Sequence, residues 1–279
     1  ILDFSKININ SEIPYPVLVG YLGYPMVSYM EKINLKNNDT LNIPDSIMIR
    51  PKLVAVFDNI KDTINIMTAV YPNKKIDPET AYLKAFQKID KVNYQLKNYF
   101  ENEKTKLKNE SDKDINFISN YTKKEYFNMV NKAKKYIREG DIFQVVLSQR
   151  FECDYKLDAK TLYRSLRRLN PSPFLVNLNF DDLGLVASSP EILVRLRDKK
   201  VTIRPIAGTR KRGQNNNEDE ILSNDLLNDK KELAEHLMLL DLGRNDVGRV
   251  SKIGSVNVTE KMQIEYYSHV MHIVSNVEG

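Results

Sequence analysis

Two carboxylates and a histidine are spaced in the sequence as they would be on one side of a helix. Glu232, Glu235 and His236 stand at positions i, i+3 and i+4, so in a helix their side chains share a side. Two carboxylates one turn apart on a rigid element form half of an oxygen site for a hard cation such as Mg²⁺. Taken alone, the same spacing also suits a solvated acidic helix face, so the surrounding sequence must decide between the two.

The element that would carry these side chains is predicted by the leucines around them. Leu233, Leu237 and Leu240 recur with a helical period, so this side of the helix should face the core. The sequence DLGRNDVGR, residues 241–249, then predicts a glycine-punctuated loop. Polar groups this close to a core are expected to be paired, and such networks are commoner at functional sites than on plain surfaces.

A second group of candidate residues lies in RPIAGTRKRG, residues 204–213. Gly208 has no side chain, so a flat ring could approach the backbone closely at this position. The hydroxyl of Thr209 could contact a substrate oxygen. An ordinary Gly-Thr turn without any ligand would show the same residues.

Two histidines lie three residues apart in the apolar run YSHVMHIV. On a strand, His269 and His272 would point to opposite faces. One is therefore expected to be structural and the other a site residue, because an imidazole can accept or donate a proton near neutral pH.

Four stretches in series resemble one enzyme family: SSPEILVR (188–195), RPIAGTRKRG (204–213), AEHLMLLDLGRNDVGR (234–249) and YSHVMHIVSNVEG (267–279). The family is that of the chorismate-utilising enzymes, which includes anthranilate synthase component I, aminodeoxychorismate synthase component I, and the isochorismate and salicylate synthases. The resemblance extends from about Gly20 to the last residue and is closest to anthranilate synthase component I.

This resemblance implies a lyase of tryptophan biosynthesis that makes anthranilate and pyruvate from chorismate and ammonia. It implies that Glu235, with Glu232 in support, holds a Mg²⁺ ion that binds the ring carboxylate. Gly208 and Thr209 would contact the substrate. His272 would lie near the ring and the departing hydroxyl.

Two positions separate the branches of the family. Isochorismate and salicylate synthases place a lysine base where this chain has Gln144, and a neutral amide cannot activate water. Aminodeoxychorismate synthases commonly place a nucleophilic lysine where this chain has Ala207. The pair resembles the anthranilate synthase combination, and aminodeoxychorismate synthase component I is the alternative.

The sequence NPSPFLV, residues 170–176, resembles the family's tryptophan-feedback motif, with Phe174 in place of the usual tyrosine. The resemblance makes Pro173, Phe174 and Leu175 candidate tryptophan contacts. A simple helix stop is the alternative, and the companion Leu-Leu-Glu-Ser motif is absent from this sequence.

The resemblance also implies a partner, because the ammonia normally comes from a glutamine amidotransferase subunit. No Gly-x-Cys-x-Gly nucleophile motif occurs here, and Cys153 is the single cysteine. Further family motifs, including a second pair of glutamates, are expected beyond Gly279. We therefore expect these 279 residues alone to be inactive. A non-catalytic tryptophan-binding or assembly module is the alternative from another functional class.

Composition narrows the remaining classes. The net charge is +5, with 42 basic and 37 acidic residues, and the lysines are scattered, which argues against nucleic-acid binding. No apolar run approaches the roughly 18 residues of a membrane span. One cysteine excludes an internal disulfide and suits a reducing, cytoplasmic location.

The order of predicted elements favours an α+β fold, because strands come in groups with helices between the groups. The charged residues 101–114 are a candidate boundary between subdomains 1–110 and 118–279. The resemblance implies a two-subdomain sandwich of antiparallel sheets flanked by helices, incomplete at the C-terminus. The predicted strands are 53–60, 63–71, 142–152, 174–180, 183–191, 192–196, 200–208, 251–258 and 267–279. The predicted helices are 77–109, one from the capping box at Thr122 to Gly140, 158–169 and the stretch from 231, with a polar loop at 214–220.

Overall fold

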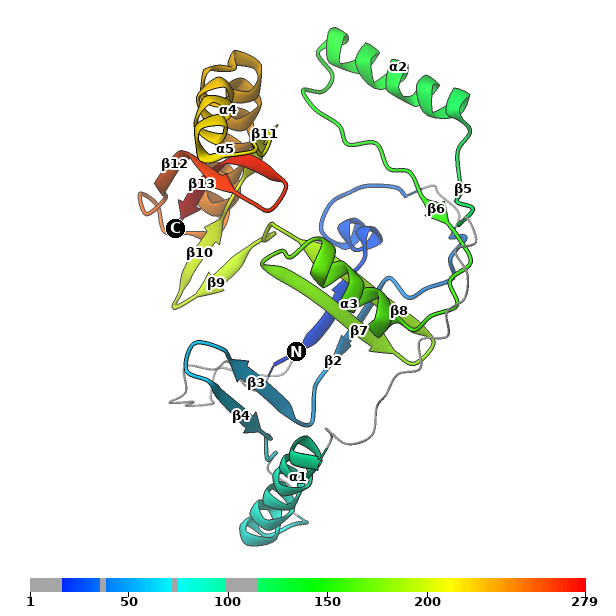
Figure 1. Ribbon diagram of the computed structural model, residues 1–279, viewed down its shortest axis with the longest axis vertical. Coiled ribbons are helices and arrows are strands. Elements are labelled where there is room, and N and C mark those ends of the chain that lie inside the picture. Colours follow the sequence, from blue (N-terminus) through cyan, green and yellow to red (C-terminus); the bar gives the residue numbers. More distant parts are fainter. Residues whose placement is uncertain (1–16, 36–38, 72–74, 99–114) are drawn as a thin grey trace. The chain divides into compact units, whose positions relative to one another are not determined.

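The computed structural model describes residues 17–35, 39–71, 75–98 and 115–279. The chain forms two compact units, Ile1–Ile118 and Ser119–Gly279, which are described separately (Figure 1). The charged stretch 101–114 lies outside the described residues.

The described residues of the first unit form two strand pairs and one long helix. The predicted hairpin is confirmed, with Val54 opposite Met67 and Asp58 opposite Thr63. A strand at residues 46–49 was not predicted, although it pairs antiparallel with the strand that begins the described chain. The elements are β1 (Val19–Leu22), the 3₁₀ helix η2 (Tyr24–Tyr29), β2 (Ser46–Ile49), β3 (Val54–Asp58), β4 (Thr63–Met67) and α1 (Pro78–Asn98).

The second unit begins with helix α2, Lys123–Glu139, whose ends form as the sequence predicts. The Thr122 hydroxyl accepts the backbone N–H of Glu125, and the Glu125 carboxylate accepts the backbone N–H of Thr122 at 2.8 Å. Gly140 ends the helix in the left-handed conformation, with φ of 80°. The helical spacing of Tyr126, Val130, Ala133 and Ile137 predicts a buried stripe. This stripe is weaker than predicted, because Ile137 is 45% exposed.

The predicted strand 142–152 is wrong over most of its length. Strand β5 is Ile118–Ser119, and only Phe151–Glu152 forms a strand in the predicted range (β6). Phe143 and Val146 are each 86% exposed, and residues 143–149 pair with no strand of the described chain. An apolar β-branched sequence becomes a strand only where a neighbouring backbone satisfies its N–H and C=O groups.

A helix and a hairpin follow, both close to prediction. Helix α3, Ala159–Leu169, is capped by the Asp158 carboxylate, which accepts the N–H of Thr161 at 2.6 Å. Strands β7 (Phe174–Phe180) and β8 (Leu183–Ser189) pair antiparallel.

The largest sheet is built around β13, Val270–Glu278. Residues 206–211 and 202–203 pair with one edge of β13, and residues 257–266 pair with the other edge. Each of these pairs is antiparallel, so the second unit is α+β as predicted. The strands are β9 (Arg195–Arg197), β10 (Lys200–Ile203), β11 (Ile206–Lys211), β12 (Asn257–Tyr266) and β13.

The predicted strand 200–208 is interrupted at Pro205, which has no N–H for the sheet, so β10 and β11 are separate. The predicted loop 214–220 is also wrong, because helix α4 begins at Asn216 after the Asn215 cap. The next predicted strand, 251–258, lies instead at 257–266.

Helices α4 (Asn216–Asn228) and α5 (Lys230–Val250) cover one face of this sheet (Figure 1). The second helix is longer than predicted, because the expected loop 241–249 is helical throughout. Its polar residues lie on the outer side, where Arg244 pairs with Asp241 at 3.0 Å, and do not form a paired network near the core. Leu237 is 48% exposed, contrary to prediction.

The core of the second unit lies between these two helices and the sheet. One cluster joins Leu226 to Met271 and Ile273, and another joins Leu240 and Val247 to Val277. The odd-numbered residues of β13 therefore face the helices. Side chains alternate along a strand, so the even-numbered residues face the other side of the sheet.

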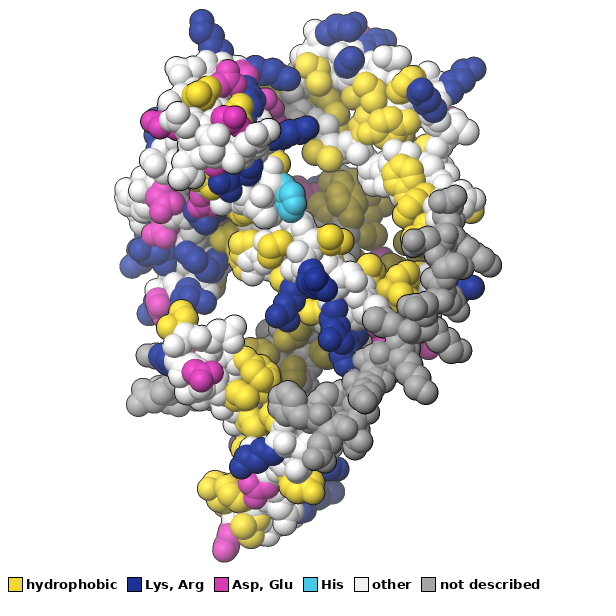
Figure 2. All heavy atoms as spheres, viewed as in Figure 1, with side chains coloured by type: hydrophobic (Ala, Val, Ile, Leu, Met, Phe, Trp, Pro, Cys, Tyr) yellow, Lys and Arg dark blue, Asp and Glu magenta, His cyan; other side chains and the backbone are white. Residues whose placement is uncertain are grey.

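Many hydrophobic side chains remain on the surface of both units (Figure 2). Among the described helices, none has the length and apolar character needed to cross a membrane.

Candidate functional site

The centre of the candidate site is a glycine bulge in β11. The register of β11 against β13 shifts between Ala207 and Thr209, and Gly208 adopts a φ of 82°. A Cβ at this position would lie 3.0 Å from the Cδ1 of Ile273. Both the backbone conformation and the lack of space therefore require glycine. The bulge turns Thr209 toward the sheet face that the helices do not cover.

His272 lies opposite Thr209 in the β11–β13 pairing, and two neighbouring groups orient its ring. The imidazole Nδ1 lies 3.1 Å from the Thr209 hydroxyl and 3.2 Å from the Gly208 carbonyl oxygen. A carbonyl can only accept, so this contact assigns the proton of the neutral ring to Nδ1. The Nε2 atom is then left as the proton acceptor. Three predicted site residues are thus brought together.

The histidine ring is supported from one side by Tyr267. The two ring centroids are 5.4 Å apart, in an edge-to-face arrangement. The tyrosine hydroxyl donates to the Glu265 carboxylate at 2.8 Å. Partial burial, followed by the hydrogen bond to Glu265, raises the pKa of Tyr267 to about 12, so its hydroxyl keeps its proton.

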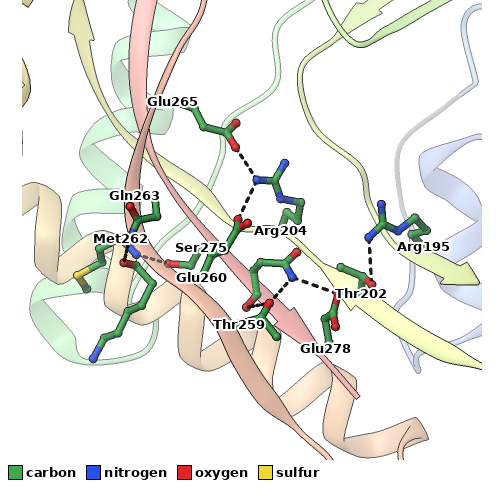
Figure 3. Close-up of polar contacts among 12 residues, drawn as sticks. Arg195, Thr202, Arg204, Thr259, Glu260, Met262, Gln263, Glu265, Ser275 and Glu278 are labelled. Atoms are coloured by element: carbon green, nitrogen blue, oxygen red, sulfur yellow. Dashed lines mark hydrogen bonds and ion pairs between the residues drawn. The ribbon is translucent and has the colours of Figure 1, made fainter. Parts of the chain in front are cut away.

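Glu265 belongs to a small ionic group on the same part of the sheet. Arg204 pairs with Glu265 and also with Glu260 at 3.3 Å (Figure 3). These pairs tie the end of β10 to β12. Tyr267 is therefore held by a chain of polar contacts that runs from the histidine to the outer strand.

Glu191 was not singled out from the sequence, although it lies in the stretch SSPEILVR. Its side chain remains accessible, yet the surrounding protein removes part of the water around the carboxyl. This desolvation raises the pKa of Glu191, and the nearby His272 opposes the shift. A carboxyl with a raised pKa beside a histidine is a candidate general acid. The signal that could have found it was its place inside a recognised stretch.

The carboxylate pair lies in the first two turns of α5. The side chains of Glu232 and Glu235 are both partly exposed, and neither forms an ion pair within the described part of the chain. The amide of Gln144 donates to Glu235 at 3.3 Å. No cluster of three or more His, Cys, Asp or Glu residues that could hold a metal occurs in the described ranges. The two carboxylates fit half of a hard-cation site, and further oxygen ligands would be needed.

The carboxylate-bearing helix and His272 meet the sheet at the same two strands, β11 and β13. Helix α5 packs against the odd-numbered residues of β13, whereas His272 is on the other face. The helix also packs along β11.

His236 does not share the exposed side of Glu232 and Glu235 as predicted. It is fully buried, and its Nε2 lies 2.7 Å from the Ser275 hydroxyl. Burial lowers the pKa of His236, opposed by the Ala207 backbone, so the ring favours its neutral form. His236 thus points into the core, whereas the sequence predicted that it would share the side of the two carboxylates.

Arg210 of β11 lies close to helices α4 and α5 and holds the start of α5 in place. Arg210 pairs with Asp225 at 2.7 Å and with Asp229 at 2.8 Å. Asp229 also caps α5 by accepting the N–H groups of Lys231 and Glu232. These hydrogen bonds, with that to Arg210 the largest, lower the pKa of Asp229. The start of the carboxylate-bearing helix is therefore fixed to the strand that carries the glycine bulge.

A pocket of about 300 Å³ opens beside the histidine. Pro173 and Phe174 form part of its apolar wall, and Glu191 and Arg195 supply charge. Leu175, the third predicted effector residue, is not among the pocket residues, because side chains alternate along β7 and Leu175 is on the other face from Phe174. Of the three predicted effector residues, Pro173 and Phe174 therefore line the same pocket.

Comparison with known proteins agrees with this geometry. Residues 3–279 match the family described as chorismate binding enzyme. The chain is 49% identical over 99% of its length to anthranilate synthase component 1 of Cereibacter sphaeroides, and covers 55% of that protein. It is 46% identical over 94% of its length to the Aquifex aeolicus protein of the same name, and covers 52% of it.

Solved structures give the same result for the fold. Anthranilate synthase component I from Streptococcus pneumoniae superposes with a TM-score of 0.85 at 34% identity, over 98% of this chain and 59% of that one. The menaquinone-specific isochorismate synthase MenF of Escherichia coli has a TM-score of 0.62 at 16% identity, over 93% of this chain and 59% of that one. The second likeness concerns the fold alone. The chain spans about half the length of the curated relatives it matches.

Proposed function

Because the chain belongs to the chorismate binding enzyme family, we propose that its full-length protein is the large subunit of an anthranilate synthase. The reaction converts chorismate and ammonia into anthranilate, pyruvate and water. The observation that carries the proposal is the contact of His272 with Thr209 at the Gly208 bulge. It supports a site for a flat ring in a chain that resembles anthranilate synthase component 1 along almost all its length.

Each residue of the site has a chemical role in this proposal. The Gly208 bulge lets the ring approach the backbone, and Thr209 donates or accepts a hydrogen bond at a substrate oxygen. Glu191 protonates the ring hydroxyl, which leaves as water while ammonia adds to the ring. His272 accepts, at Nε2, the proton that the ring loses when pyruvate is eliminated.

Mg²⁺ is the proposed cofactor, held by Glu235 with Glu232 in support. When bound, Mg²⁺ would neutralise the ring carboxylate and polarise the ring toward attack. Among the residues described, the donors are two carboxylates on one helix without an ion pair, one of them in contact with Gln144, so the remaining oxygens would come from elsewhere and from the substrate.

The nucleophile and the position of attack follow from two side chains. Gln144 is neutral and donates to Glu235, so it offers no base to activate water. Ala207 has no nucleophile at the turn. These residues favour ammonia as the nucleophile and anthranilate as the product.

The proposal extends to assembly and regulation. We propose a two-subdomain sandwich of antiparallel sheets for the full-length protein, with a separate glutamine amidotransferase subunit that supplies ammonia in the cytoplasm. We further propose that tryptophan binds the pocket of Pro173 and Phe174 as an inhibitor. The apolar wall would contact the indole ring, and Arg195 would receive the carboxylate.

Product analysis tests the proposed function. The full-length protein is incubated with chorismate, ammonium and Mg²⁺, and the products are separated by liquid chromatography with mass detection. Anthranilate and pyruvate in equal amounts are expected. Isochorismate or 4-amino-4-deoxychorismate as the main product would contradict the proposal and assign the protein to another branch of the family.

A further inference from the structure

The buried pair His236 and Ser275 has no role in the proposed chemistry, yet its position is unusual. Both side chains are fully buried, and His236 is the immediate neighbour of Glu235. The imidazole Nε2 lies 2.7 Å from the Ser275 hydroxyl oxygen. A buried hydrogen bond between two side chains is costly to leave half made, so it constrains the elements that carry it.

The serine connects more than one element to the helix. Its hydroxyl oxygen accepts the backbone N–H of Met262 at 2.9 Å (Figure 3). Its own backbone N–H donates to the carbonyl of Pro205, just before β11, at 3.2 Å. Ser275 therefore joins β12, the start of β11 and α5 at a single position of β13.

The Met262 contact joins Ser275 to an irregular part of β12. Met262 has a φ of 52° in an irregular part of β12, a conformation that disfavours a residue with a side chain. The hydroxyl oxygen accepts from Met262, and its second lone pair and its proton both remain for His236 Nε2. The direction of the His236–Ser275 hydrogen bond therefore depends on the tautomer of the histidine.

The second polar anchor of the helix lies seven residues earlier, at Asp229. Its carboxylate caps α5 and pairs with Arg210 of β11. Seven residues are about two turns of an α-helix. Glu232 and Glu235 therefore lie between two anchors, one to β11 and one to β13.

We propose that His236 is a positioning residue, whose hydrogen bond to Ser275 holds Glu235 in place for a divalent cation. The inference rests on the proposed function, since it assigns the residue to the carboxylate pair. Residues that hold metal ligands in orientation typically change metal affinity by roughly 10–100-fold when they are replaced.

The test is Mg²⁺ binding to the full-length protein, measured by titration calorimetry with Mg²⁺ alone, without chorismate. His236→Phe fills the ring volume without a ring nitrogen, and Ser275→Ala removes the hydroxyl. Each should weaken Mg²⁺ binding about tenfold. His236→Gln can place an amide group near the position of Nε2 and should restore most of the affinity.

Ser268→Ala is the matched control. Ser268 also contacts a histidine, His269, at 2.8 Å, but both residues are exposed. This variant should bind Mg²⁺ as the unsubstituted protein does. The double variant His236→Phe with Ser275→Ala should be no weaker than either single one, because both remove the same contact.

The outcomes separate the two proposals. Mg²⁺ affinity that is unchanged in Ser275→Ala and His236→Phe, with only the melting temperature lowered, would overturn the positioning role alone. If His236→Phe does not fold, Ser275→Ala decides the question, because it deletes a single oxygen. Failure of the unsubstituted protein to bind Mg²⁺, with or without chorismate, would overturn the metal site and the inference together.

Discussion

The hydroxyl of Thr209 lies 3.1 Å from Nδ1 of His272, directly across the β11–β13 pairing. The Gly208 carbonyl shares the same nitrogen at 3.2 Å. A bulge that only glycine can form thus fixes the tautomer of a histidine on the open face of the sheet.

Replacing the threonine tests whether its hydroxyl matters to the reaction. Thr209→Val keeps the shape but removes the hydrogen bond, and we expect kcat/KM for chorismate to fall about tenfold, the value of a typical hydrogen bond. Thr209→Ser keeps the hydroxyl and should retain most activity. Equal rates for the valine and serine variants, measured by anthranilate fluorescence, would show that the hydroxyl has no part in catalysis.

We expect the reaction to require Glu191, because its carboxyl donates a proton to the departing hydroxyl. Glu191→Gln has the same shape but cannot transfer a proton, so kcat should fall by a factor of roughly 100 or more, with KM little changed. Glu220→Gln, on the exposed side of α4, is the control and should behave as the unsubstituted protein. A similar kcat in Glu191→Gln would rule out the general-acid role.

The pH dependence of the rate gives an independent check on Glu191. Its folded-state pKa is raised, so the carboxyl stays protonated to a higher pH than an ordinary glutamate. A general acid works only while protonated, so kcat should fall as pH rises through the raised pKa. In a plot of kcat against pH for Glu191→Gln, this fall at high pH should be absent from the residual activity.

Gly208 is required for its left-handed backbone conformation and for its lack of a side chain beside Ile273. Comparison with another glycine separates the cost of the conformation from the cost of the close contact. Gly208→Ala imposes a left-handed alanine, which costs roughly 1–2 kcal/mol, and adds a contact with Ile273. Gly254 has a φ of 80°, and a Cβ there would meet nothing within 4 Å, so Gly254→Ala should carry the backbone cost only. Urea unfolding should rank Gly208→Ala as the less stable. Equal stability of the two would contradict the close packing described at the bulge.

Tryptophan binding should depend on the pocket beside the histidine. Phe174→Ala removes part of the apolar wall and should weaken tryptophan binding roughly tenfold or more, as expected for loss of a buried aromatic contact. Phe151→Ala, an exposed phenylalanine outside the pocket, is the control. Calorimetric titration with tryptophan measures both variants. Unchanged affinity in Phe174→Ala would place any effector site elsewhere.

Much of the second unit could be predicted from local sequence. The capping box at Thr122 and the stop at Gly140 form because the groups that satisfy the helix ends lie within a few residues of each other. The sequence also singled out Gly208, as a position where a ring could approach the backbone. The bulge with a positive φ at this glycine was not predicted.

Other features depend on contacts that local sequence does not contain. Residues 142–149 have a strand sequence but pair with no strand in the described chain. Residues 241–249 continue helix α5, because Gly243 and Val247 are buried against the core of the second unit. The local sequence, with its glycines and charged residues, predicted a loop and gave no sign of this packing. His236 was predicted on the carboxylate side, but its position is set by Ser275, 39 residues later.

The most direct test of the central claim is the rate of anthranilate formation by the full-length protein, with chorismate, ammonium and Mg²⁺, compared with its His272→Asn variant. The asparagine amide can replace Nδ1 as a donor to the Gly208 carbonyl but offers no Nε2 proton acceptor. We predict anthranilate formation by the unsubstituted protein and a loss of roughly 100-fold or more in kcat for the variant. No anthranilate from the unsubstituted protein, or an equal rate in His272→Asn, would contradict the account.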